Sequence, residues 1–106
     1  MTDLILGIDG GGTSCRAAVA RPDGTILGRG KSGAANILTD PNNAIISITE
    51  AAKAAYRDGG LDEAGVDGAS AFLGLAGTNV GDLTRYVHDR LPFRHTDIDS
   101  DGLIAL

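Results

Sequence analysis

The chain has 106 residues, of which 42% are hydrophobic and 22% are charged, and its formal net charge is −5. This length suits one domain, and this composition excludes an intrinsically disordered chain. An acidic domain is repelled by phosphate backbones and by anionic lipid, so we expect neither nucleic acid nor a membrane surface as a partner.

The single cysteine, Cys15, cannot form an internal disulfide, and the sequence shows neither a signal segment nor a long apolar run. We therefore expect a cytoplasmic protein. The sequence stops inside an apolar pattern, whereas chain ends are more often polar. We expect residues 1–106 to be the N-terminal part of something longer.

The first thirty residues predict three strands that pair antiparallel. A short apolar run, residues 4–8, is typical of a buried strand, and residues 15–20 and 25–29 follow as the second and third strands. The sequence RPDG at residues 21–24 predicts a tight turn between the last two, with a positive backbone angle at Gly24. Residues 31–36 read as a small-residue loop.

Helices and strands alternate in the remainder of the chain. A helix is expected from Pro41, capped by Asp40 and ended by Gly59 and Gly60. A fourth strand over residues 69–76, a second helix stopped by Pro92 and a fifth strand over residues 93–99 follow. This order predicts an α/β fold with a mixed five-stranded sheet, antiparallel in its first three strands and parallel in its β-α-β-α-β part, flanked by helices.

A glycine-rich stretch, GIDGGGTS, follows the first strand. Bare backbone can approach an anion closely, and the hydroxyls of Thr13 and Ser14 can add donors. A carboxylate beside phosphate, as Asp9 would be, requires a cation, and Mg²⁺ is the natural choice. The stretch therefore predicts a phosphate site, although the same glycines could simply shape a hairpin turn.

The motif and its surroundings resemble the BadF/BadG/BcrA/BcrD ATPase family, within the superfamily of sugar kinases, heat-shock chaperones and actin. The resemblance covers nearly the whole chain and includes GIDGGGTS, PDGTILG, SGAANI, LGLAG and DSDG in the expected order. It implies a ribonuclease H-like, actin-like ATPase domain over residues 1–106. The family's second domain, with its adenosine pocket, has no counterpart in this sequence, so we expect the isolated chain to be inactive.

The resemblance also implies roles for individual residues. ATP and Mg²⁺ are the implied cofactors, with Asp9 interacting with Mg²⁺ through water. The β- and γ-phosphates would contact Gly11, Gly12, Thr13 and Ser14. The implied sugar-binding residues are Asn36, Gly77, Thr78 and Asp99, and Asp99 is also the implied catalytic base.

Asp99 is a reasonable base on its position alone. It ends a predicted parallel strand, where open α/β sheets bind ligands, and phosphoryl transfer needs a base near the nucleophile. Asp97 would share its face and Asp101 would lie beyond the strand, so both are rivals. The acidic cluster could also merely cap a following helix, as Asn36 could merely suit a loop.

The resemblance implies an ATP-dependent kinase that phosphorylates N-acetylglucosamine or glucosamine, as a homodimer in its full-length form. One alternative is a family ATPase that activates a partner enzyme, although those proteins hold an iron–sulfur cluster through cysteines and only Cys15 is present here. The other is a non-catalytic interaction domain of actin-like fold, which an intact Asp9 and Asp99 disfavour.

Overall fold

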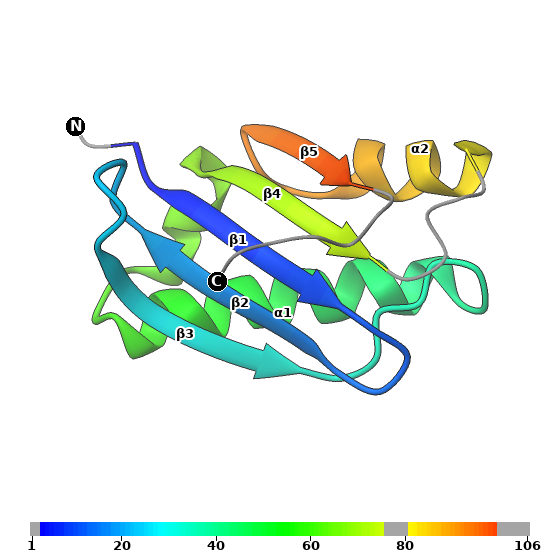
Figure 1. Cartoon of the computed structure of the whole chain (residues 1–106), viewed down its shortest axis with the longest axis horizontal. Helices are drawn as coiled ribbons and strands as arrows, with labels where there is room; N and C mark the ends of the chain where they lie inside the picture. The colour runs from blue at the N-terminus through cyan, green and yellow to red at the C-terminus, as the bar shows by residue number, and fades with distance from the viewer. Residues whose placement is uncertain (1–2, 76–80, 100–106) are drawn as a thin grey trace.

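The computed structural model describes residues 3–75 and 81–99, which form one mixed sheet with helices packed against it (Figure 1). The sheet order is β3-β2-β1-β4-β5; β1, β2 and β3 pair antiparallel, and β4 and β5 run parallel to β1. The predicted mixed five-stranded sheet is confirmed. The elements are β1 (Ile5–Gly10), β2 (Cys15–Ala20), β3 (Ile26–Ser32), α1 (Pro41–Asp58), the 3₁₀ helix η1 (Glu63–Gly68), β4 (Ser70–Leu75), α2 (Gly81–Arg90) and β5 (His95–Asp99).

The turn between β2 and β3 has the predicted chemistry. Gly24 has a φ of 95°, a conformation that favours glycine. The Asp23 carboxylate accepts a hydrogen bond of 2.9 Å from the backbone N–H of Thr25, and this bond lowers the pKa of Asp23. Local side-chain and backbone preferences therefore define this turn.

Helix α1 begins and ends where its capping residues predict. The Asp40 carboxylate accepts from the backbone N–H of Asn43 at 3.0 Å, and Pro41 occupies the first turn. At the other end the N–H of Gly59 donates to the carbonyl of Ala55 at 3.1 Å. The cap residues thus satisfy backbone groups that a helix end would otherwise leave unpaired.

Helix α1 lies close to β3 because the residues at their contact are glycines in β3 and alanines in α1. A Cβ atom at Gly28 would lie 2.3 Å from the carbonyl oxygen of Ala55, and one at Gly30 would lie 2.4 Å from that of Ala51. The two glycines alternate along β3 and face the alanine stripe of α1, which is fully buried. The absence of a Cβ atom at Gly28 and Gly30 allows the backbone of α1 to approach this closely.

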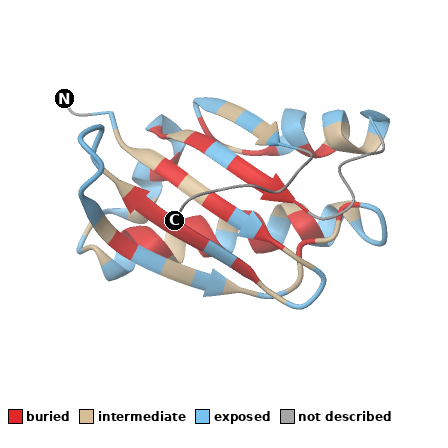
Figure 2. Ribbon diagram, viewed as in Figure 1, coloured by how far each residue is buried: buried red, intermediate tan, exposed pale blue. Residues whose placement is uncertain are grey.

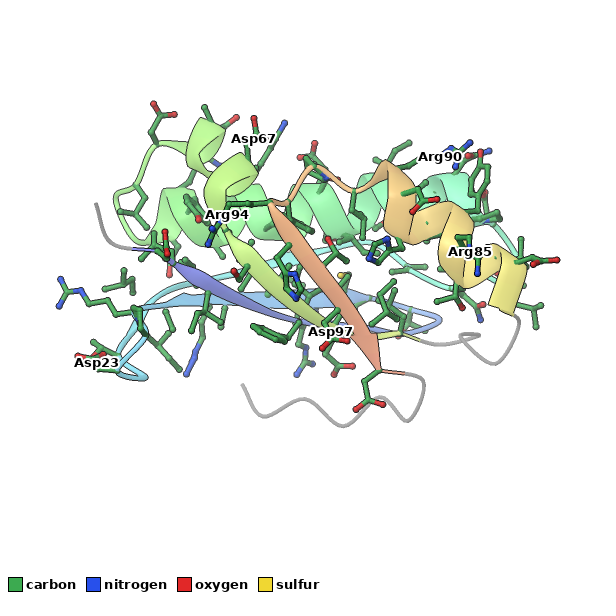
Figure 3. The ribbon with its side chains drawn as sticks, turned by 90° about the horizontal axis from the view of Figure 1, so that it is seen from above. Asp23, Asp67, Arg85, Arg90, Arg94 and Asp97 are labelled. Atoms are coloured by element: carbon green, nitrogen blue, oxygen red, sulfur yellow. The ribbon has the colours of Figure 1, made fainter. Side chains whose placement is uncertain are left out.

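The core occupies one side of the sheet. Leu6 and Ile8 of β1, Val19 of β2 and Leu73 of β4 are all fully buried against Ile48 and its neighbours on α1. Figure 2 shows buried residues alternating with more exposed ones along β1 and the first half of β4, as strand geometry requires, whereas the last three residues of β4 are all buried. Figure 3 shows α1 and α2 on the same side of the sheet. Among the described residues no helix covers the opposite side, which we call the open face.

Several predicted boundaries need correction. Residues 31 and 32 belong to β3 and not to a loop, because Lys31 and Ser32 pair with Arg16 and Cys15 of β2. The fifth strand begins at His95, two residues later than predicted, since Phe93 turns into the core. The 3₁₀ helix η1 was not predicted. No helix in the described ranges is long and apolar enough to cross a membrane.

Candidate functional site

Two predicted site aspartates lie in one row across the ends of the parallel strands. Asp9 of β1 is the register partner of Gly74 of β4, and Gly74 is the register partner of Asp99 of β5. Both aspartates are exposed, and strand alternation places both side chains on the open face. Two strand spacings separate their Cα atoms by about 10 Å. Gly74 leaves the space between the two carboxylates without a side chain of its own.

The row continues with the opposite charge on the other side of Asp9. Arg16 of β2 is the register partner of Asp9, and Lys31 of β3 is the partner of Arg16. Charge therefore changes from positive to negative across the edge of the sheet. We did not predict a role for Arg16. The available signal was its position: an alternating strand that returns antiparallel from the glycine stretch places Arg16 on the same face as Asp9.

The glycine stretch forms the connection between β1 and β2. The N–H of Gly11 donates to the carbonyl of Ser14 at 2.9 Å, and the carbonyl of Gly11 accepts from the N–H of Ala35 at 2.9 Å. Within the described part of the chain, the N–H groups of Gly12 and Thr13 make no hydrogen bond. Both residues are exposed, so these N–H groups are the donors available to an external acceptor.

The hairpin alternative does not explain the glycine at position 12. Tight hairpin turns use glycine where φ is positive, but Gly24 and Gly60 are the only glycines with positive φ in the described ranges. A Cβ atom at Gly12 would meet nothing within 4 Å. Neither backbone conformation nor packing within the described chain therefore requires glycine at position 12, whereas close approach of a ligand to the backbone would.

Gly10 differs from its neighbours. A Cβ atom there would lie 2.8 Å from Cδ2 of Leu75 and 3.0 Å from Cβ of Ala35. Gly10 is buried in β1, so packing explains it. This corrects our grouping of all three glycines as bare backbone for an anion, and it shows that the loop before Asn36 packs directly against the end of β1.

Asn36 lies in that loop, which the Ala35–Gly11 hydrogen bond ties to the glycine stretch. The backbone N–H of Leu38 donates to Oδ1 of Asn36 at 3.0 Å. This is the local turn expected of a loop asparagine. The same bond orients the amide, and Nδ2 has no hydrogen-bond partner among the described residues. Oδ1 of Asn36 therefore stabilises the loop, and Nδ2 is available to donate a hydrogen bond to a ligand.

The structure describes only some of the remaining predicted site residues. Gly77 and Thr78 lie outside the described residues, as does Asp101. Asp97 shares the open face with Asp99 but sits one row further from the strand ends, beside Phe72 of β4. Figure 3 shows it on the side of the sheet away from the helices. The two acids of β5 therefore differ in their distance from the glycine stretch.

No preformed metal cage is present in the described ranges, where no group of three or more His, Cys, Asp or Glu side chains gathers. One exposed carboxylate, that of Asp9, stands beside the glycine stretch. This donor set fits Mg²⁺, which binds through one or two carboxylates together with phosphate oxygens and water. It would not fit a structural zinc ion, which needs four protein ligands.

Cys15 begins β2 and is fully buried. Burial raises the pKa of its thiol to about 12, because the charged thiolate is disfavoured away from water. Its thiol is therefore neutral at physiological pH and packs as a small apolar side chain. Thiolate is the form that binds metal, so Cys15 offers no ligand for a cluster in this conformation.

Comparison with known proteins bears on the family and the fold of the chain. The family model described as the BadF/BadG/BcrA/BcrD ATPase family matches residues 6–106. The chain belongs to this family. Glucosamine kinase GspK of Vibrio cholerae is 34% identical over 98 residues, which are 92% of this chain and 33% of that protein. A structure described as an N-acetylglucosamine kinase from Chromobacterium violaceum superposes with a TM-score of 0.85 at 25% identity.

The structural match covers 95% of this chain and 36% of the Chromobacterium protein. It confirms the predicted actin-like ATPase fold. The chain spans about a third of the length of both relatives.

Proposed function

We propose that the protein is an ATP-dependent kinase that transfers the γ-phosphoryl group to a hydroxyl of an amino sugar. The observation that carries this proposal is the row at the strand ends: two exposed carboxylates on one face, separated by a glycine, with a bare-backbone loop beside the first. The two relatives, which are described as a glucosamine kinase and an N-acetylglucosamine kinase, support the class of acceptor.

The glycine stretch is assigned to the nucleotide phosphates. The free N–H groups of Gly12 and Thr13 and the hydroxyls of Thr13 and Ser14 would donate to phosphate oxygens. Gly11 shapes the loop, because both its N–H and its carbonyl bond within the protein. Arg16, on the same face as Asp9, adds a planar donor suited to phosphate.

Asp9 would hold Mg²⁺ through water, beside the phosphates. The bound ion supplies charge neutralisation on the transferring phosphoryl group. The chain's own contribution is to fix a carboxylate at the end of β1, where the sheet register holds it next to the loop.

Asp99 is assigned as the base that accepts the proton of the attacking hydroxyl. It lies in the same row as Asp9, across the side-chain-free Gly74, so an acceptor between the two would face both. Asp97 lies one row further away and is the weaker candidate. Asn36 would donate from Nδ2 to a sugar hydroxyl, and Gly77 and Thr78 remain proposed acceptor residues.

The chain provides one wall of such a site. Its relatives are about three times as long, so we propose that turnover needs polypeptide matching their remaining part, and that the isolated chain does not turn over ATP. Closure of a second domain would exclude water from the phosphates. A homodimer remains our expectation for the complete protein.

The test is ATP consumption by the complete gene product with glucosamine, N-acetylglucosamine, glucose or no sugar, with the phosphorylated product identified by mass spectrometry. We expect turnover that depends on one of the two amino sugars. Hydrolysis that is equally fast without sugar would contradict the kinase proposal and favour an ATPase that acts on a partner. The isolated 106-residue chain serves as the control, because we propose that turnover needs polypeptide that this chain does not contain.

A further inference from the structure

A groove of about 430 Å³ lies on the open face of β2 and β3, and one of its lining residues, Arg16, is the register partner of Asp9. Its charged lining side chains are all cations: Arg16, Arg29 and Lys31. The other lining residues are alanines and a glycine, so nothing acidic enters the groove. The volume falls in the range of small-molecule sites.

The arrangement of the cations destabilises the pairing of β2 and β3. Arg16 and Lys31 are direct register partners, and like charges directly opposite one another destabilise a pair of strands. Arg29 is the partner of Ala18, so it stands one row further along the same face. The arrangement gives three cations in two adjacent rows.

Asp9 is the register partner of Arg16, and the Asp58 carboxylate accepts a hydrogen bond from the backbone N–H of Arg29, but neither carboxylate forms an ion pair with a groove cation in the described ranges. Elsewhere in the described ranges Arg57 pairs with Glu63 at 2.8 Å and Arg94 with Asp3 at 3.4 Å, but none of the three groove cations forms an ion pair there. In a chain of net charge −5, acidic side chains are more numerous than basic ones, so a wholly cationic groove is unexpected. An anion that enters the groove would remove the repulsion between Arg16 and Lys31.

The groove adjoins the glycine stretch but extends beyond it. Arg16 lies two residues after Ser14, at the edge where the nucleotide phosphates are proposed to bind. Arg29 is two residues from Lys31, which places it about 7 Å further along the strand. Phosphates held by Gly12 and Thr13 would therefore engage Arg16 and leave Arg29 and Lys31 for another group.

We propose that Arg29 and Lys31 form a second anion site that binds a free phosphate or a phosphomonoester beside the nucleotide. The ligand chemistry is a phosphate group that carries about two negative charges, which matches a site of two cations in a small groove. The proposal rests on the proposed function for its relation to the nucleotide, but the phosphate site itself can be tested without ATP.

The first experiment titrates inorganic phosphate into the 106-residue chain at constant ionic strength, followed by backbone and arginine side-chain NMR shifts. The double variant Arg29→Ala/Lys31→Ala is compared with Arg21→Ala/Lys53→Ala, which removes the same charge from the β2–β3 turn and from α1. We expect saturable shifts on β2 and β3, an affinity about tenfold lower in the groove variant, and less than about twofold change in the control.

An equal loss of affinity in both double variants would show only non-specific attraction and would overturn the site. Phosphate shifts without saturation would overturn it as well. Sedimentation of the same samples tests a second copy of the chain as occupant. A dimer that forms in the wild type and is lost only in the groove variant would assign the face to that copy instead.

The second experiment repeats the phosphate titration on the complete gene product saturated with Mg-ATP. We expect phosphate to bind with an affinity within about twofold of that without nucleotide, because the two sites are adjacent and distinct. Loss of phosphate binding would show that phosphate reports only the nucleotide's own site, which overturns the second site. Failure of Mg-ATP to bind, with the phosphate titration intact, would contradict the proposed function alone.

Discussion

Gly12 has no side chain at a point where the described chain offers room for one. A Cβ atom there meets nothing within 4 Å, and φ is not positive. We therefore expect Gly12→Ala to change the free energy of unfolding by less than about 0.5 kcal/mol. We expect the same change to lower Mg-ATP affinity about tenfold, because a methyl group would intrude where the phosphates approach the backbone.

Urea denaturation and calorimetric titration of Mg-ATP would measure both effects in the complete gene product. Gly68→Ala is the matched control, since Gly68 also has open space around its Cβ position but lies in η1. If Gly12→Ala leaves the affinity for Mg-ATP unchanged, the glycine stretch has only a structural role.

Two substitutions distinguish the role of Asn36 in the loop from its proposed role in binding a ligand. Asn36→Asp keeps an oxygen to accept the Leu38 N–H but loses the Nδ2 donors, whereas Asn36→Ala loses both. We expect Asn36→Asp to retain stability within about 0.5 kcal/mol while KM for the sugar rises about tenfold, and Asn36→Ala to lose about 1 kcal/mol of stability as well. An unchanged KM for Asn36→Asp would remove Asn36 from the acceptor site.

Cys15 links pH to stability. Its folded pKa, raised to about 12 by burial, exceeds that of an exposed thiol, near 8.5. The neutral thiol is fully stabilising below about pH 8.5, and this contribution is lost as pH rises towards 12, because only the unfolded chain ionises there. Urea denaturation between pH 8 and 10, with reductant, should therefore show a steeper fall in the free energy of unfolding for the wild type than for Cys15→Ala. Parallel slopes would contradict this account.

Part of the candidate site was visible in the sequence. Asp9 and the glycine stretch follow an apolar run that is typical of a strand, and Asp99 was identified from the family resemblance and from its position at the end of a predicted strand. Gly74 and Arg16 were not singled out, because their importance comes from register partners that are distant in sequence. Gly10 was misjudged for the same reason: its close neighbour Leu75 is 65 positions away.

At the scale of elements, β3 and α1 are held together by a close contact between glycine and alanine. A Cβ atom at Gly30 would lie 2.4 Å from both the carbonyl oxygen of Ala51 and the N–H nitrogen of Ala55, and backbone atoms cannot yield as a flexible side chain can. We expect Gly30→Ala to lower the free energy of unfolding by about 1–3 kcal/mol, as overpacking does.

The urea midpoint of Gly30→Ala, compared with that of Gly12→Ala, measures this effect. Both substitutions add one methyl group, but only the first adds it against a helix. A midpoint for Gly30→Ala equal to that of the wild type would mean that α1 packs further from β3 than the structure shows.

Elements with strong local signals were predicted best. The caps of α1 and the turn at Gly24 depend on residues within a few positions, and both lie where predicted. The end of β3 and the start of β5 depend on the length of the neighbouring strand and on Phe93 packing in the core. Such limits come from tertiary contacts, so local patterns misplace them by two or three residues.

At the scale of the whole molecule, the sheet acts as a scaffold that brings distant residues to one edge. The order β3-β2-β1-β4-β5 places cations from the N-terminal hairpins on one side of Asp9 and the acids of β5 on the other. Helices α1 and α2 pack on one face and leave the charged row on the open face (Figure 3). In the proposed function, the phosphate donor and the hydroxyl acceptor would meet beside Gly74.

The most direct test of this account compares Asp99→Asn with the wild type in the complete gene product. Sugar-dependent turnover and Mg-ATP affinity are measured on the same samples. We predict that turnover falls by at least about a hundredfold, because the amide cannot accept the hydroxyl proton, while Mg-ATP affinity stays within about twofold. Sugar phosphorylation at the wild-type rate in Asp99→Asn would contradict the assignment of the strand-end row as the catalytic site.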